Sequence, residues 1–304
     1  MALFPWLCAA TARPPKAAGE TMVFTSFHGN GDGLHLSVST DGGHRWRDLD
    51  RVFLTPEVGG RLLRDPHILR GPDGVYRMVW TTGWKDKGIG YASSRDLIHW
   101  SAQRYIPVME GVPGTNNAWA PETVYDPASR AYVITWSSDV DGRFPATRRS
   151  GQMNNRTYYV TTKDFATFST PGVLIDPGFD HIDTTILRVG SRYVAVFKEG
   201  DNQERGRWGP IQWAVADRVL GPYRLMPKPL VTGERAEGPT LVTDGDRTRL
   251  YVDYYANGRY GAFETRDWRT WRDVSDAVRL VKGQRHGTVL TIPSHVAKAL
   301  EEAH

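Results

Sequence analysis

Arg64-Asp65-Pro66-His67-Ile68 is the first of four short segments in which polar or acidic residues give way to an apolar run. The other three are Ala120-Pro121-Glu122-Thr123-Val124, Ile182-Asp183-Thr184-Thr185-Ile186 and Glu237-Gly238-Pro239-Thr240-Leu241. A second apolar run follows each segment, at residues 76–82, 132–138, 193–199 and 249–255. The pattern predicts a repeated unit of short strands with a carboxylate at the inner end of each copy.

A second signal, an Asp followed by an aromatic residue, ends each unit and gives the number of copies. It is found at Asp41 with Trp46, Asp96 with Trp100, Asp164 with Phe168, Asp267 with Trp271 and, more weakly, Asp217 with Tyr223. The intervals between these signals suit a four-stranded blade repeated around an axis. Five copies predict five blades, in which the Asp side chains cap tight turns and are structural.

The two ends of the chain complement each other. Residues 285–292 read as a strand with no further runs behind it, whereas residues 21–27, 34–39 and 52–55 read as three strands with no inner strand before them. We expect the C-terminal strand to become the inner strand of the N-terminal blade, which removes exposed sheet edges. The predicted fold is therefore all-β, a five-bladed β-propeller whose ring is closed by a C-terminal inner strand.

Composition indicates one domain. With 40% hydrophobic residues, 304 residues can bury a substantial core, and we expect a single propeller over 20–293. Residues 294–304 are expected to form a tail or a short helix. The segment 1–19 reads either as a degenerate signal segment, which would place the protein in the periplasm or outside the cell, or as a disordered tail.

Charge and hydropathy exclude several partners. No run of 18 apolar residues occurs, which argues against a membrane span. The net charge of +4 is mild and the basic residues are scattered, so no patch for nucleic acid is present. The single cysteine, Cys8, excludes an intrachain disulfide, and the oligomeric state stays open.

The predicted fold brings five polar side chains to the same end of a central funnel: Asp65, Glu122, Asp183, Glu237 and His286. Each alone suits a turn or a loop. Crowded carboxylates repel one another, so they accumulate where separated pKa values or cation binding is useful. Hydrolysis of a glycosidic bond needs one protonated carboxylic acid and one ionised carboxylate, and a third acid can raise the pKa of the proton donor. Trp119 precedes the second segment and is placed either to contact a sugar or to pack.

In chain order, these motifs resemble those of glycoside hydrolase family 43, over residues 21–292. The resemblance implies a five-bladed propeller and inversion at the anomeric carbon. It implies Asp65 as general base, Glu237 as general acid, and Asp183 as the acid that orients Glu237 and raises its pKa. His286 matches a central histidine that in many members lies beside a cation, often Ca²⁺, although no cofactor is required.

Two departures from the family pattern concern the strand order and Glu122. Many members carry Asp where this chain has Glu122, and many begin with the strand that bears the base, whereas here three strands precede it. The second departure is a moved point of ring closure. We place Trp119, Glu122, Asn155, Arg156 and His286 in the substrate pocket.

The sequence thus predicts an inverting, exo-acting glycoside hydrolase that releases a terminal α-L-arabinofuranosyl or β-xylosyl unit from plant-type polysaccharides or oligosaccharides. Two alternatives stay open: a glycosidase of the same fold that acts on galactosides, and a propeller that binds carbohydrate without turnover. A retaining fructan hydrolase needs an upstream nucleophile motif that residues 20–60 lack, and a sialidase needs six blades.

Overall fold

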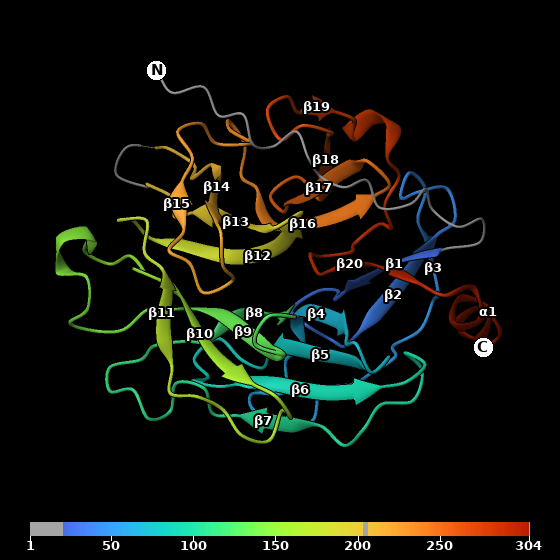
Figure 1. Ribbon diagram of the computed structural model, residues 1–304, viewed down its shortest axis with the longest axis horizontal. Coiled ribbons are helices and arrows are strands. Elements are labelled where there is room, and N and C mark those ends of the chain that lie inside the picture. Colours follow the sequence, from blue (N-terminus) through green and yellow to red (C-terminus); the bar gives the residue numbers. More distant parts are fainter. Residues whose placement is uncertain (1–20, 203–205, 304) are drawn as a thin grey trace.

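Five four-stranded antiparallel sheets, arranged as blades around a central axis, make up most of the computed structural model (Figure 1). The structure describes residues 21–202 and 206–303, so the predicted N-terminal segment 1–19 lies outside the described residues. The prediction of an all-β, five-bladed β-propeller is confirmed.

Four blades follow one another along the chain, each from an inner strand to a short outer strand. The first contains β4 (Arg64–Arg70), β5 (Tyr76–Thr81), β6 (Ile89–Ser94) and β7 (Arg104–Ile106). The second contains β8 (Trp119–Asp126), β9 (Ala131–Ser138), β10 (Arg156–Thr162) and β11 (Gly172–Ile175). The third contains β12 (His181–Val189), β13 (Arg192–Glu199), β14 (Ile211–Ala216) and β15 (Arg224–Leu225). The fourth contains β16 (Glu237–Asp244), β17 (Arg247–Tyr254), β18 (Arg259–Thr265) and β19 (Arg272–Asp273).

The fifth blade joins the two ends of the chain. Its order is β20 (Val289–Ile292), β1 (Thr21–Ser26), β2 (His35–Ser39) and β3 (Arg47–Asp48), so the last strand lies innermost. Met22 pairs with Thr291 and Phe24 with Val289. The predicted ring closure is therefore confirmed, and β20 covers the inner edge of β1 that would otherwise be unpaired.

The turn that ends each unit uses its Asp as a cap. Asp41, Asp96, Asp164 and Asp267 each accept backbone N–H bonds from residues three or four positions further on. For example, the N–H groups of His99 and Thr270 lie 2.8 Å from the carboxylates of Asp96 and Asp267. These four acids are structural, as the sequence indicates. Asp217, in the weaker copy, instead pairs with Arg192.

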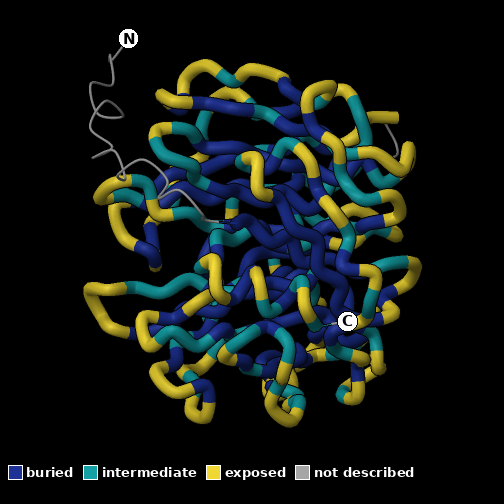
Figure 2. The backbone as a smooth tube through the Cα atoms, turned by 90° about the vertical axis from the view of Figure 1, so that its right-hand side faces the viewer, coloured by how far each residue is buried: buried dark blue, intermediate teal, exposed yellow. Residues whose placement is uncertain are grey.

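Apolar side chains fill the spaces between neighbouring blades, and the strands are buried while the loops that join them are exposed (Figure 2). The C-terminal helix α1 (Ser294–Glu302) packs Val296, Ala297 and Leu300 into the cluster formed by the fifth and first blades. Two 3₁₀ turns, Pro145–Thr147 and Ser275–Ala277, lie in connecting loops. Among the described residues, no helix has the length and apolar character needed to cross a membrane.

Candidate active site

Four inner strands begin with the same backbone distortion. The φ angle is 55° at Asp65, 44° at Ala120, 56° at Asp183 and 53° at Gly238, and the strand pairing shifts register just after each residue. Such a left-handed conformation costs a non-glycine residue on the order of 1–3 kcal/mol and is often kept at functional sites. At Gly238 a side chain would also collide with the ring of His286.

A small cavity of about 20 Å³ lies on the axis beside these distortions. Its polar lining consists of Asp65, His67, Glu122, Asp183, His286 and Thr288. It has room for about one water molecule. The expected meeting of acids around one axial space is therefore present, although Glu237 stands at its edge rather than in its lining.

His286 is the centre of this arrangement. Its Nε2 lies 2.7 Å from Oδ1 of Asp65, and its Nδ1 lies 3.7 Å from Oδ2 of Asp253 and 3.8 Å from Oε1 of Glu237. Burial alone would lower the pKa of His286, but the negative charges of Asp65, Asp253 and Asp183 raise it well above its ordinary value. The side chain is therefore an imidazolium that joins the acids from both edges of its ring.

Asp65 is held in its ionised form. Thr81 Oγ1 donates a 2.6 Å hydrogen bond to Oδ2 of Asp65 and accepts one from the N–H of Ala120. Burial raises the pKa of Asp65, but His286, Arg64 and Thr81 outweigh burial, so this pKa lies below its ordinary value. A carboxylate of this kind can accept a proton from water.

The pKa of Glu237 is shifted in the opposite direction. Burial raises its pKa to about 7, with help from Asp183 and Asp253 and against the positive charges of His286 and Arg285. Arg285 joins two of these acids, because its Nη2 lies 2.6 Å from Glu237 and its Nε lies 2.7 Å from Asp253. A carboxylic acid with a pKa near neutrality is suited to donate a proton.

Asp183 lies beside Glu237 because a main-chain bond fixes it. Its Oδ2 accepts the N–H of Gly238 at 2.9 Å, and its own N–H donates to Oγ of Ser137. Burial raises the pKa of Asp183, the charge of His286 lowers it, and Asp65 raises it again, with a net upward shift.

Glu122 lies further along its inner strand than the sequence suggests. It comes two residues after the distorted Ala120 and pairs with Thr135. Its Oε2 lies 3.5 Å from Nε2 of His67, whose Nδ1 accepts the N–H of Thr123. Burial lowers the pKa of His67 to about 3 and raises that of Glu122 to about 8. The contact therefore joins two neutral groups and is not an ion pair at neutral pH.

Of the other predicted pocket residues, Trp119 contacts Trp84, whereas Asn155 and Arg156 lie elsewhere. Trp119 donates from Nε1 to the carbonyl of Trp84, and the two rings meet edge to face with centroids 5.9 Å apart. Trp84 remains 49% exposed. Together they form an aromatic wall near Arg64, whose guanidinium lies 4.4 Å from the Trp84 ring.

The placement of Asn155 and Arg156 in the central cavity is corrected by the structure. Both are fully buried and neither lines that cavity. Asn155 donates to Asp180, and Arg156 donates from Nε to Asp176 and from Nη2 to Thr147. Their side chains join the loops around β10.

Sequence reasoning missed Asp253 and did not assign a role to Arg285. Asp253 is buried on β17 opposite Glu237, and its signal was a lone acid in the otherwise apolar run 249–255. Arg285 directly precedes His286, so its position in the motif was a usable signal.

The expected Ca²⁺ beside His286 stays a prediction. Glu237, Asp253 and His286 bring ligand-type atoms within 4.8 Å of one another. The guanidinium of Arg285 lies beside two of these acids, Glu237 and Asp253.

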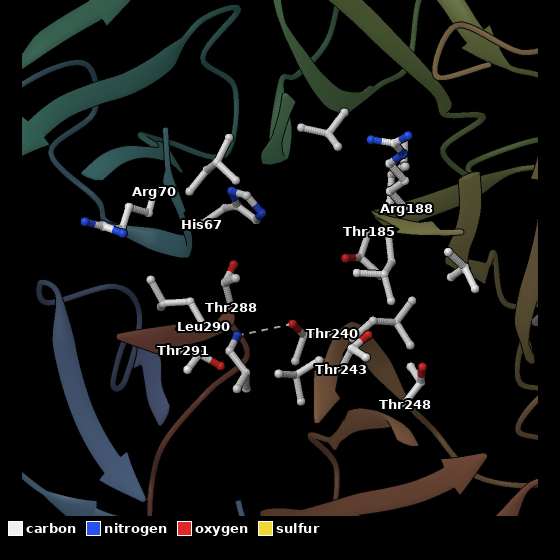
Figure 3. A pocket seen from close by; sticks show the side chains of 18 of the residues that line it. His67, Arg70, Thr185, Arg188, Thr240, Thr243, Thr248, Thr288, Leu290 and Thr291 are labelled. Carbon is white, nitrogen blue, oxygen red and sulfur yellow. Dashed lines mark hydrogen bonds between the residues drawn. The ribbon is translucent and has the colours of Figure 1, made fainter. Parts of the chain in front are cut away.

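A larger cavity, of about 800 Å³, opens at the opposite end of the axis (Figure 3). His67 and Thr288 line both cavities and separate them. Threonine hydroxyls and aliphatic side chains dominate its wall, and Thr240 and Leu290 lie on the inner strands of two neighbouring blades, with Thr288 just before β20 (Figure 3). Asp65, Asp183, Glu237 and His286 are absent from its lining.

The fold and the site define a propeller with the carboxylate pair of a glycosidase, and comparison with known families agrees. A family model for a glycosyl hydrolase 43-related group, described as a probable glycosyl hydrolase domain, matches residues 19–297. The match covers nearly all of the chain, and the chain belongs to this family.

Individual relatives are distant. An α-L-arabinofuranosidase of Bifidobacterium longum is 25% identical over 185 residues, which cover 54% of this chain and 17% of that protein, so the match spans less than a fifth of the relative. The solved α-L-arabinofuranosidase from Lactobacillus brevis shares 17% identity with a TM-score of 0.55, covering 70% of this chain and 72% of its own. A xylan β-1,4-xylosidase from Bacillus halodurans shares 18% identity with a TM-score of 0.53. The match covers 69% of this chain and 41% of the xylosidase chain. These structural likenesses show the fold.

Proposed function

We propose that this protein is an inverting, exo-acting glycoside hydrolase that releases a terminal pentose from plant-type polysaccharides or their oligosaccharides. The observation that carries the proposal is the relation of Asp65 to Glu237. A carboxyl group whose pKa is lowered and one whose pKa is raised stand at opposite edges of the His286 ring. Inverting hydrolysis requires this pairing of states.

In the proposed reaction, Asp65 accepts a proton from a water molecule as the water oxygen bonds to the anomeric carbon. Glu237 gives its proton to the leaving glycosidic oxygen as the bond from that oxygen to the anomeric carbon breaks. Asp183 holds the position of Glu237 through Gly238 and keeps its pKa high. Each turnover leaves Asp65 protonated and Glu237 ionised, and proton exchange with solvent restores both.

The contacts of the two carboxyls allow the spacing that inversion needs. Oδ1 of Asp65 lies 2.7 Å from Nε2 of His286, and Oε1 of Glu237 lies 3.8 Å from Nδ1 of the same ring. Inverting enzymes need roughly 6.5–9.5 Å between their two carboxyls, so that a water fits between base and sugar, whereas retaining enzymes need only about 5–5.5 Å.

The choice of an arabinofuranosyl or xylosyl unit rests on likeness. The curated relative and one solved neighbour are named as α-L-arabinofuranosidases, and another neighbour as a β-xylosidase. The aromatic wall of Trp84 and Trp119 offers flat faces at the mouth, where a sugar ring can stack. Galactosides remain the second substrate class to be tested.

A panel of aryl α-L-arabinofuranosides, β-xylosides and β-galactosides tests the proposal. We expect hydrolysis of at least one pentoside by the unaltered protein and its near-complete loss in Asp65→Asn. The matched control is Asp96→Asn, because Asp96 caps a distant turn. Binding of pentosides without any hydrolysis would favour the non-catalytic carbohydrate-binding propeller, and turnover of galactosides alone would replace the pentose assignment.

A further inference from the structure

Three metal-ligating side chains meet in the loop between β1 and β2, away from the central cavity. His28, Asp32 and His35 each place one ligand-type atom within 4.8 Å of the other two. The imidazole rings of His28 and His35 stack with centroids 3.9 Å apart, and Nε2 of His35 lies 2.9 Å from Oδ2 of Asp32. Two imidazoles and one carboxylate form a donor set that zinc and neighbouring transition metals bind.

Hydrogen bonds that stabilise the loop account for Asp32 and His35. Oδ1 of Asp32 accepts the N–H of His28 at 2.9 Å, and its other oxygen contacts His35. These bonds do not account for the His28 side chain, whose Nε2 is buried with no hydrogen-bond partner among the described residues. A buried polar atom without a partner costs about 1–3 kcal/mol. A metal ion would use that nitrogen.

The loop that carries these residues is firmly held. Its turn is closed by a 2.9 Å bond from the N–H of Gly31 to the carbonyl of His28, and Leu63 donates to the carbonyl of Gly31. Gly31 has a φ of 106°, and a Cβ there would lie 2.7 Å from Cγ of Arg64. The donor groups therefore stand on a fixed backbone that rests against Arg64, the residue before Asp65.

We infer that His28, Asp32 and His35 bind one divalent transition-metal ion of the Zn²⁺ class, with a fourth position open to water. Tetrahedral coordination with bonds of about 2.0–2.1 Å needs ligand atoms roughly 3.4 Å apart. The ligand atoms of the three side chains all lie within 4.8 Å of one another, and Nε2 of His35 lies 2.9 Å from Oδ2 of Asp32. The ion would fasten the hairpin to which Arg285 is bonded through the carbonyl of Phe27.

Titration with Co²⁺ and Zn²⁺ tests this inference without reference to activity. The protein is used without an affinity tag and in a Cys8→Ser background, which removes the only thiol. We expect one equivalent of Co²⁺ to give visible d–d absorption that Zn²⁺ abolishes, and calorimetry to show the same stoichiometry for Zn²⁺. His28→Gln and Asp32→Asn should each weaken binding by roughly tenfold or more.

Two controls make the result specific. His99→Gln alters an exposed His–Asp pair with the same three-residue spacing as Asp32 and His35 but without a second imidazole, and it should leave the titration unchanged. Asp253→Asn alters the other cluster of ligand-type groups and should also leave it unchanged. The inference is overturned if the unaltered protein shows no stoichiometric binding, if folded His28→Gln binds as tightly, or if Asp253→Asn removes the signal. Circular dichroism verifies that each variant is folded.

Discussion

Asp183 accepts a hydrogen bond from the backbone N–H of Gly238, 2.9 Å away, across the boundary between the third and fourth blades. This bond fixes a carboxyl group next to Glu237, the residue that precedes Gly238. Because the two acids are held close in a buried place, the charge of one raises the pKa of the other. The pKa of the proposed proton donor thus depends on how two blades meet.

Asp183→Asn should move the pH profile of kcat/KM. Glu237 must be protonated to act, so activity falls as the pH rises through its pKa, which is about 7. Removing the negative charge of Asp183 lowers that pKa, and the alkaline limb of the profile should shift to lower pH. A limb that stays in place would show that Asp183 does not control Glu237.

Arg285→Gln should shift the same limb the other way. The guanidinium lies 2.6 Å from Glu237 and stabilises its ionised form. Without it, the pKa of Glu237 rises and activity should persist to higher pH. The pH profile is measured beside that of Arg272→Gln, which alters an exposed arginine on β19 and should match the unaltered protein. An identical profile for Arg285→Gln would contradict the assigned role of Glu237.

Glu237→Gln should discriminate between substrates by their leaving groups. The loss in kcat should be roughly 10²–10⁴-fold on natural glycosides, whose leaving oxygen needs a proton. It should be much smaller on aryl glycosides with acidic phenols. Steady-state kinetics on both substrate types checks this prediction, and equal losses on the two would exclude Glu237 as proton donor.

His286 should make the folded state sensitive to alkali. The pKa of His286 in the folded protein is raised well above its ordinary value of 6.5. The ion pairs of His286 therefore stabilise the protein fully at pH values below 6.5, and this stabilisation is lost as the pH rises through the folded pKa. In thermal melts across the alkaline range, His286→Gln should therefore lose less stability with rising pH than the unaltered protein. Parallel curves for the two proteins would show that the imidazolium is not the relevant charge.

The C-terminal helix should contribute to stability through Leu300. This side chain is 1% exposed in the cluster between the fifth and first blades. Leu300→Ala should lower the free energy of unfolding by about 2–5 kcal/mol. Lys298→Ala, on the exposed face of the same helix, should change it by less than about 0.5 kcal/mol. Chemical denaturation of both variants measures the difference, and equal effects would mean that α1 does not belong to the core.

The fold could be predicted because each blade repeats the same change from polar to apolar residues, and because the two chain ends carry complementary halves of one blade. The register of the inner strands could not be predicted from the sequence. Glu237, Asp183 and Glu122 look alike in sequence, but their places relative to the distorted residue of each strand differ. Glu237 comes one residue before the distorted Gly238, Asp183 is itself the distorted residue, and Glu122 comes two residues after the distorted Ala120. A shift of one residue in a strand reverses the direction of a side chain, so sequence alone could not place them at different depths.

Asn155 and Arg156 illustrate a different limit. Polar residues at the start of a strand look the same whether they face a pocket or bind the loop of a neighbouring strand, and here Asp176 and Asp180 bind them. Asp176 lies 20 residues from Arg156 and Asp180 lies 25 residues from Asn155 along the chain, so their pairing depends on tertiary structure. The same reason hid the contact between Arg285 and Asp253.

The central claim is that Asp65 and Glu237 form an inverting acid–base pair, and the configuration of the first sugar released tests it most directly. Proton NMR during hydrolysis of an aryl α-L-arabinofuranoside or aryl β-xyloside follows the anomeric signal before mutarotation. The account predicts that the inverted anomer appears first. First appearance of the retained anomer would contradict it.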